Sequence, residues 1–197
     1  MGRKFFAREA AEVARELVGA VLVRQVGGEE LRVRVVETEA YVGPHDLACH
    51  ASKGRTKRTE VMFGEAGHAY VYFCYGMHHL LNVVSGQIGD AQAVLIRAAE
   101  PINFQANLTG PGNLTKALYI TTADNGTDLV ENNDIFFEKN KGGGRQKQTK
   151  IDISRRIGVD YAGKWKDALL RFTDTQSTAV SGRKRKTSLA KGATPCT

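Results

Sequence analysis

The chain has 197 residues, of which 42% are hydrophobic and 25% charged, and this composition suits a soluble domain with a packed core. Its 28 Lys and Arg residues outnumber its 21 Asp and Glu residues, so the formal net charge is +7. The excess favours an anionic partner such as nucleic acid, although a merely basic soluble protein would also show it, because net charge governs association and not fold.

The N-terminal part predicts a helix followed by a β-hairpin. Residues 8–18 place their apolar side chains on one helical face, and Gly19 is positioned to end the helix. A strand at 20–25 and an alternating strand at 31–41 flank a glycine turn at 27–28. This arrangement is typical of two antiparallel neighbours.

The middle of the chain predicts further strands. Residues 43–60 are polar and irregular, and apolar strands follow at 69–74 and 91–98. A glycine-rich loop then precedes a helix at 114–118, with Asn113 as the expected N-cap. The last predicted elements are a loop rich in glycine and lysine and two closing strands, at 141–150, 153–160 and 168–172.

These elements predict one α+β domain over residues 1–180, built mainly from antiparallel sheet with a few helices. From Ser181 onward, a run of Arg and Lys among small polar residues predicts a disordered basic tail over 181–197.

The cysteines and the apolar runs exclude several classes of protein. Cys49, Cys74 and Cys196 lie far apart, so neither a structural zinc site nor an iron–sulfur cluster is expected. Their odd, small number fits a reducing, intracellular setting. No apolar run reaches the ~20 residues of a membrane span, and the N-terminus lacks a signal-peptide core. We expect a soluble intracellular protein.

Two carboxylates stand out in the strand at 31–41. Glu37, Glu39 and Tyr41 alternate and therefore share one face. Two carboxylates beside a ring can form a general-base site with a stacking surface. Alternatively, the two glutamates are exposed strand charges beside a core tyrosine, which is the simpler interpretation of this segment alone.

An aromatic segment follows at 70–77. Tyr75 falls at the turn marked by Gly76, where a bulky side chain can project, and Met77 flanks it. A projecting aromatic side chain can wedge between base steps and replace an extruded nucleotide. Taken alone, the segment is also explained as a tyrosine-rich strand packed in a sheet.

Arg97 and Asn82 each interrupt an apolar strand. A buried charge needs a partner, and Glu39 is a suitable one for Arg97. Asn82 could orient a group inside a pocket. The basic run at 53–58 could contact phosphates or form a solvated loop.

In this order, the segments closely resemble the alkyladenine (3-methyladenine, N-methylpurine) DNA glycosylase family. The resemblance covers most of residues 5–172, and ETEAY followed by YVYxxYGM and LIRAxEP is highly specific. The similar stretches are LVGAVLVR (17–24), VVETEAYVGPHDLACH (35–50), RTKRTEVMF (55–63), GHAYVYFCYGMHHLLNVVS (67–85), AVLIRAAEP (93–101), GPGNLTKAL (110–118) and RRIGV (155–159).

The resemblance implies roles at matching positions. Glu39 would be the general base that deprotonates the attacking water, and Arg97 would help to hold that water. The resemblance further implies a base pocket of Tyr41, His50, Tyr72 and Asn82 and an intercalating Tyr75. From the residues alone, Met77 is expected to flank Tyr75 at the intercalation site, and Arg55, Lys57 and Arg58 of the basic run are expected to contact the DNA backbone. Asn82 would discriminate against normal guanine.

The resemblance also implies a curved sheet and a monofunctional base-excision repair enzyme. The enzyme would flip 3-methyladenine, 7-methylguanine, hypoxanthine or ethenoadenine out of double-stranded DNA and hydrolyse the N-glycosidic bond. No cofactor, metal ion, membrane or protein partner is expected, and the protein would be a monomer. It would lie with the DNA, in the cytoplasm of a prokaryote or the nucleus of a eukaryote.

Two alternatives come from other classes. One is a non-catalytic damaged-DNA-binding module of the same fold. The other is a helix–hairpin–helix repair enzyme, which residues 110–115 loosely mimic, although the catalytic Asp of such an enzyme has no clear candidate. Compared with many relatives, the connection at 102–109 is short and predicts a missing helix, and residues 167–172 depart from the family pattern.

Overall fold

The structure is a computed structural model that describes residues 1–140 and 149–182. Most of the loop expected at 141–150, and the tail beyond residue 182, lie outside the described residues. None of the described helices is long and apolar enough to span a membrane.

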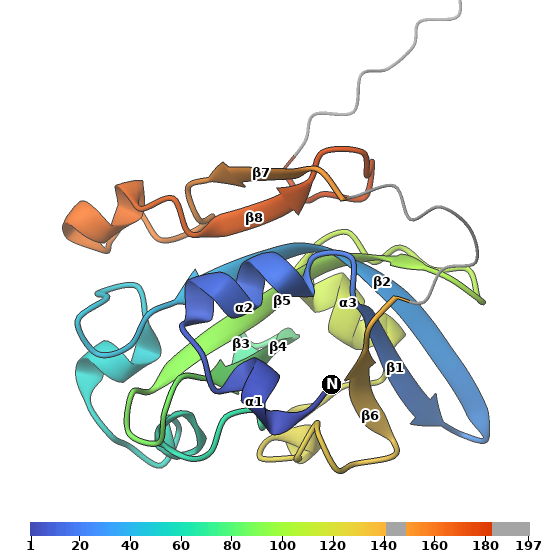
Figure 1. The fold of residues 1–197 in the computed structure, drawn as a ribbon, viewed down its shortest axis with the longest axis horizontal. Helices are drawn as coiled ribbons and strands as arrows, with labels where there is room; N and C mark the ends of the chain where they lie inside the picture. The colour runs from blue at the N-terminus through green and yellow to red at the C-terminus, as the bar shows by residue number, and fades with distance from the viewer. Residues whose placement is uncertain (141–148, 183–197) are drawn as a thin grey trace, which may run out of the picture.

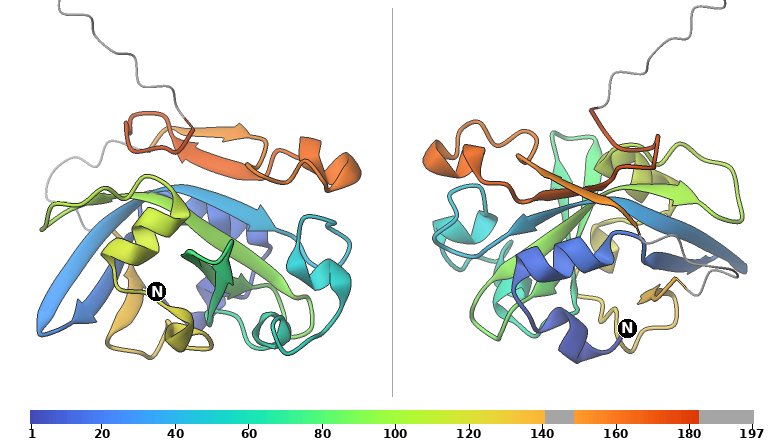
Figure 2. Two further views of the ribbon diagram at one scale, coloured as in Figure 1. Left: turned by 180° about the vertical axis from the view of Figure 1, so that it is seen from behind. Right: turned by 45° about the horizontal axis from the view of Figure 1, so that its top comes forward.

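A strongly curved antiparallel sheet dominates the fold (Figures 1 and 2). Its main path runs β3-β4-β5-β2-β1-β6, and β8 joins it by pairing with both β2 and β7. The strands are β1 (Val21–Val26), β2 (Glu29–Tyr41), β3 (Ala69–Cys74), β4 (His78–Ser85), β5 (Gln92–Pro101), β6 (Ile135–Glu138), β7 (Ile151–Ser154) and β8 (Arg171–Asp174). The predicted α+β fold with a curved antiparallel sheet is confirmed.

The helices are short and few. They are α1 (Arg3–Phe6), α2 (Ala10–Leu17) and α3 (Pro111–Ala117), with 3₁₀ segments η1 (His50–Lys53), η2 (Glu60–Phe63), η3 (Thr122–Asp124) and η4 (Gly163–Asp167). Helix α2 buries Ala10, Val13, Ala14 and Leu17, so the predicted apolar face is confirmed. These side chains join one core with Leu114 of α3 and the sheet.

The two faces of β5 show how the sheet positions a site. Val94 and Ile96 belong to the main core, whereas the alternate residues Leu95 and Arg97 line a cavity on the opposite face. Strand geometry explains this separation, because successive side chains point to opposite faces. Packing on one face therefore fixes the direction of the polar side chains on the other.

Several local predictions are confirmed and others are wrong. The β1–β2 hairpin forms at the expected glycine turn, and residues 102–109 contain no helix. Asn113 is not the N-cap of α3, because Pro111 occupies the first turn and Gly110 precedes it. The closing strands are shorter than predicted, since the chain leaves β7 after Ser154. The elements α1, β4 and β6 were not predicted.

A buried ion pair ties the loop after β2 to the segment after β7. The Arg156 Nη1 and Nη2 atoms donate to the two Asp46 carboxylate oxygens at 2.5 and 2.9 Å, and both side chains are fully buried. The Arg156 guanidinium also lies 4.8 Å from the Tyr41 ring centroid. The pair therefore holds residues 155–168 against the end of β2.

We expect Asp46→Ala to lower the free energy of unfolding by about 3–5 kcal/mol, because it leaves a buried guanidinium without a counter-ion. Urea denaturation measures this change. The matched control is Asp167→Ala, which breaks the exposed 2.9 Å pair with the adjacent Arg155 and should cost less than about 1 kcal/mol. Equal, small losses in both variants would contradict the assignment of Asp46 and Arg156 as the stabilising pair.

Candidate active site

A cavity of about 430 Å³ opens on the face of the sheet opposite the main core. Its walls come from β2, β3, β4 and β5, from residues 48–62, from Gly110 and the first turn of α3, and from the segment after β7. The sequence-predicted residues that line it are Tyr41, His50, Arg58, Tyr72, Tyr75, Asn82 and Arg97. Tyr41 and Arg97, which are 56 positions apart in the sequence, therefore line the same cavity.

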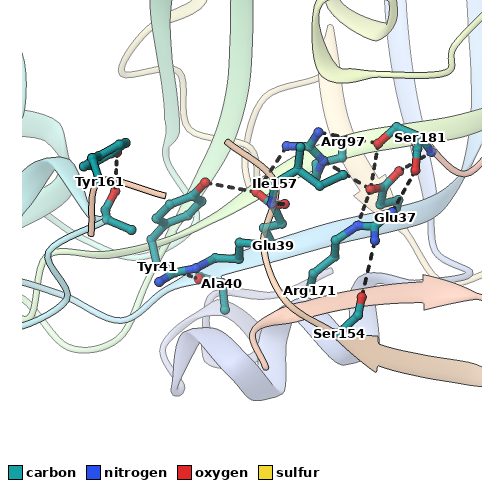
Figure 3. Close-up of polar contacts among 12 residues, drawn as sticks. Glu37, Glu39, Ala40, Tyr41, Arg97, Ser154, Ile157, Tyr161, Arg171 and Ser181 are labelled. Carbon is teal, nitrogen blue, oxygen red and sulfur yellow. Dashed lines mark hydrogen bonds and ion pairs between the residues drawn. The ribbon is translucent and has the colours of Figure 1, made fainter. Parts of the chain in front are cut away.

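Glu39 is fully buried on β2 and is held by three donors (Figure 3). The Ile157 backbone N–H donates to Oε1 at 2.8 Å. The Tyr41 hydroxyl donates to Oε2 at 3.0 Å, and Arg97 Nη1 donates to the same atom at 3.2 Å. An ionised carboxylate offers about four acceptor sites, so three donors leave one acceptor site of Glu39 unused in the described structure. Glu39 itself does not line the cavity, and its partners Tyr41, Arg97 and Ile157 do.

Burial raises the pKa of the Glu39 carboxyl, and the nearby Glu37 carboxylate raises it further. The positive charge of Arg97 and the hydrogen bonds from Ile157 and Tyr41 oppose this rise without cancelling it. Because a carboxylate of raised pKa takes a proton more readily, these surroundings suit a general base.

Glu37 is the structural partner of this arrangement. Its carboxylate accepts from Arg97 Nε at 3.2 Å and from Arg171 Nε at 2.6 Å. Ser181 donates to it from its backbone N–H at 2.7 Å and from Oγ at 2.8 Å. With so many donors, Glu37 holds Arg97 in position beside Glu39. The interpretation of both glutamates as exposed strand charges is wrong, because both are fully buried.

Ser181 also bears on the expected tail. The sequence places it at the start of that tail, yet its side chain is buried and bonded to Glu37. Residues 183–197 lie outside the described residues.

Aromatic rings form the body of the cavity. The His50 ring packs edge-on to Tyr72, with centroids 4.6 Å apart, and Tyr70 lies 5.4 Å from Tyr72. Asn82 Nδ2 donates to the Tyr70 carbonyl at 3.0 Å, which fixes this amide on β4 inside the cavity. Offset and edge-on rings leave aromatic surface on which a planar base can stack.

His50 is held as a neutral ring. Burial lowers its pKa to about 4, and the positive charges of Arg58 and Lys53 lower it further. Its Nδ1 lies 2.8 Å from the Tyr70 hydroxyl.

Tyr75 projects from the turn between β3 and β4. Its side chain is 89% exposed, and its backbone adopts the left-handed region with φ 50°. A bulky residue rarely adopts this conformation, so the turn holds Tyr75 outward at a cost. Met77 is also largely exposed. The predicted projection of Tyr75 is confirmed, whereas the insertion of Tyr75 and Met77 into DNA stays a prediction.

The predicted basic run divides into different environments. Arg55 pairs with the exposed Glu60 and lies over Phe63, away from the cavity lining, and Lys57 is exposed. Arg58 instead lines the cavity and lies over Tyr72.

Sequence reasoning missed several residues of the site. Arg171 also follows apolar residues at a strand. As for Arg97, a charge in such a position needs a partner, and this argument could have identified Arg171. No local pattern identifies the remaining ones. The missed residues are Ile157, Tyr161, Arg171 and Ser181, of which Tyr161 and Ile157 line the cavity.

The described part of the chain, residues 1–140 and 149–182, contains no group of three or more His, Cys, Asp and Glu side chains arranged to hold a metal ion.

Comparison with known proteins assigns the family. Residues 4–178 match the methylpurine-DNA glycosylase family model. A Legionella pneumophila (strain Lens) protein is 52% identical over 171 residues, covering 86% of this chain and 91% of its own. A Myxococcus xanthus protein is 49% identical over 180 residues, covering 90% and 91%. A Methanocella arvoryzae protein is 45% identical over 197 residues, covering 92% and 95%. All three are assigned by name to the 3-methyladenine DNA glycosylases. The chain therefore belongs to the methylpurine-DNA glycosylase family.

Proposed function

We propose that this DNA glycosylase releases alkylated or deaminated purines from double-stranded DNA by hydrolysis and leaves an abasic site. Its substrates would come from the class of 3-methyladenine, 7-methylguanine, hypoxanthine and ethenoadenine. The observation that carries the proposal is Glu39, buried beside an aromatic cavity and held by Arg97, Tyr41 and Ile157. The enzyme would act inside the cell as a monomer, without a cofactor or a protein partner.

Base flipping is the first step. A stacked base hides its glycosidic bond, and extruding it costs a few kcal/mol. Tyr75 would fill the vacated stack, since its exposed ring already projects at the cavity mouth. Stacking on the cavity rings would return about 1–3 kcal/mol per base. Together these contacts can offset the cost of extrusion.

Hydrolysis is the second step. Glu39 would take a proton from a water molecule as that water attacks the anomeric carbon, a contribution of about 10²–10⁴-fold. Its negative charge would also stabilise the oxocarbenium-like transition state, as in glycoside hydrolysis generally. Arg97, held by Glu37, would keep the Glu39 carboxylate ionised and oriented.

The reaction would leave the DNA strand intact. Among the described residues that line the cavity, none is lysine, so a Schiff-base route lacks its amine nucleophile. A borohydride-trapped covalent adduct between enzyme and DNA would contradict this assignment.

We expect Glu39→Gln to lower single-turnover release of 3-methyladenine or hypoxanthine by about 10²–10⁴-fold, because the amide cannot accept the water proton. Binding of lesion-containing duplex, measured by fluorescence anisotropy, should persist. The matched control is Glu29→Gln at the exposed start of β2, which should leave release unchanged. If the wild-type protein binds the lesion duplex but releases no base, the alternative of a non-catalytic binding module is correct.

We expect the rate of base release to fall at acidic pH as Glu39 becomes protonated, and at a higher pH than for a free glutamate, because burial raises this pKa. Tyr41→Phe removes a hydrogen bond that lowers the Glu39 pKa while keeping the ring, so the acid limb should move further toward neutral pH. The pH dependence of single-turnover rates measures both effects. Tyr72→Phe is the control, since Tyr72 makes no hydrogen bond to Glu39 in the described structure. A downward shift in Tyr41→Phe would refute the assignment.

We expect Tyr75→Ala to slow release from duplex DNA by about 10-fold or more, because the stack loses its replacement ring. Release from a single-stranded oligonucleotide should change much less, since there is no duplex stack to fill. Tyr119→Ala is a close control, because Tyr119 is another exposed tyrosine with a left-handed backbone (φ 53°) and does not line the cavity. Equal effects on duplex and single strand would argue against a wedge.

A further inference from the structure

Arg58 is exposed, yet its guanidinium contacts the rings of the cavity. Its guanidinium is 5.0 Å from the Tyr72 ring centroid, and its Nη2 lies 3.2 Å from His50 Nε2. It lines the same cavity as both rings. Arg55, three positions earlier, instead pairs with Glu60 through two hydrogen bonds of 2.9 and 2.5 Å. Of these two arginines, only Arg58 is therefore positioned to contact a base.

The contact with Arg58 fixes the tautomer of His50. A guanidinium only donates hydrogen bonds, so His50 Nε2 must accept and its proton must reside on Nδ1. That N–H then donates to the Tyr70 hydroxyl oxygen. Both ring nitrogens of His50 are engaged, and its side chain presents no spare N–H to a ligand. Arg58 therefore offers N–H donors here that His50 does not, and the Tyr70 O–H is the other donor beside them.

A donor group of this kind distinguishes purines by their exocyclic atoms. A 6-oxo purine presents acceptors at O6 and N7, which a guanidinium can bond in a bidentate manner, whereas a 6-amino purine presents a donor at position 6. The positive charge adds a second distinction, because it repels a base made cationic by alkylation. A neutral 6-oxo purine meets both conditions.

We propose that Arg58 is a specificity-determining residue, which bonds the O6/N7 edge of the flipped base and favours neutral 6-oxo purines such as hypoxanthine over cationic 6-amino purines such as 3-methyladenine. The proposal rests on the function proposed above and names the substrate class that this cavity selects. It replaces, for Arg58, the role of phosphate contact expected from the sequence.

The test compares two lesions in one duplex sequence. Single-turnover release of hypoxanthine and of 3-methyladenine is measured for the wild type, Arg58→Ala, Arg58→Lys and the neighbouring Lys57→Ala. In Arg58→Ala we expect hypoxanthine release to fall by about 10-fold or more, the value of one lost bidentate contact. Release of 3-methyladenine should stay unchanged or rise. Arg58→Lys should restore little of the hypoxanthine rate, because an ammonium lacks the planar pair of donors.

The ratio of the two rates separates a base contact from a backbone contact. If Arg58 only held a phosphate, Arg58→Ala would slow both lesions equally and would reduce the salt dependence of binding, as is expected for any phosphate contact made by Lys57. Equal losses, or no change in either rate, overturn the proposal. If the wild type releases neither base, the proposed function itself fails, and the Arg58 proposal fails with it.

Discussion

The site depends on placing two carboxylates inside a β-sheet without leaving their charge uncompensated. An isolated buried carboxylate is too costly to persist in its ionised form, and it would take up a proton instead. Here Glu37 and Glu39 share the guanidinium of Arg97, and Arg171 gives Glu37 a second one. Two negative and two positive charges balance within the cluster. This balance lets the buried Glu39 carry a negative charge, although burial still raises its pKa.

The division of labour between the two glutamates follows from their partners. Glu37 is saturated by two arginines and by Ser181, so no acceptor capacity remains for a ligand. Glu39 receives fewer and longer contacts, and its pKa is raised by burial. The first carboxylate therefore fixes Arg97, and the second is left able to accept a proton. The two glutamates are equally buried, but only Glu39 is left able to act as a base.

The sequence predicted those parts of the site that have local causes. Strand alternation placed Glu37, Glu39 and Tyr41 on one face, and an arginine among apolar residues indicated the Arg97–Glu39 contact. The first inference needs only neighbours along one strand. The second starts from the apolar neighbours of Arg97, although its partner Glu39 lies 58 positions away on β2. Both inferences are confirmed by the hydrogen bonds to Arg97 and Tyr41.

The parts that sequence did not predict depend on distant segments. The Ile157 N–H reaches Glu39 across 118 positions, and Ser181 reaches Glu37 across 144. A backbone N–H carries no side-chain signature, and a serine among small polar residues is also typical of a disordered tail. Strand β4 was missed because most of it is buried, so its apolar run does not alternate. Such contacts form only in the folded sheet and leave no local pattern in the sequence.

Charge balance also decides how the cavity can treat its ligand. Arg97 is offset by Glu37 and Glu39, and Arg156 by Asp46. His50 is neutral, and within the described chain Arg58 forms no ion pair. The remaining formal charge at the cavity is therefore positive. A cationic base could be attracted only by the aromatic rings, through cation–π interactions of about 0.5–2 kcal/mol. At Tyr72, Arg58 already makes such an interaction. Under the proposed function, positive charge on a lesion would weaken its glycosidic bond without improving its fit, so binding and bond lability would favour different members of the proposed substrate class.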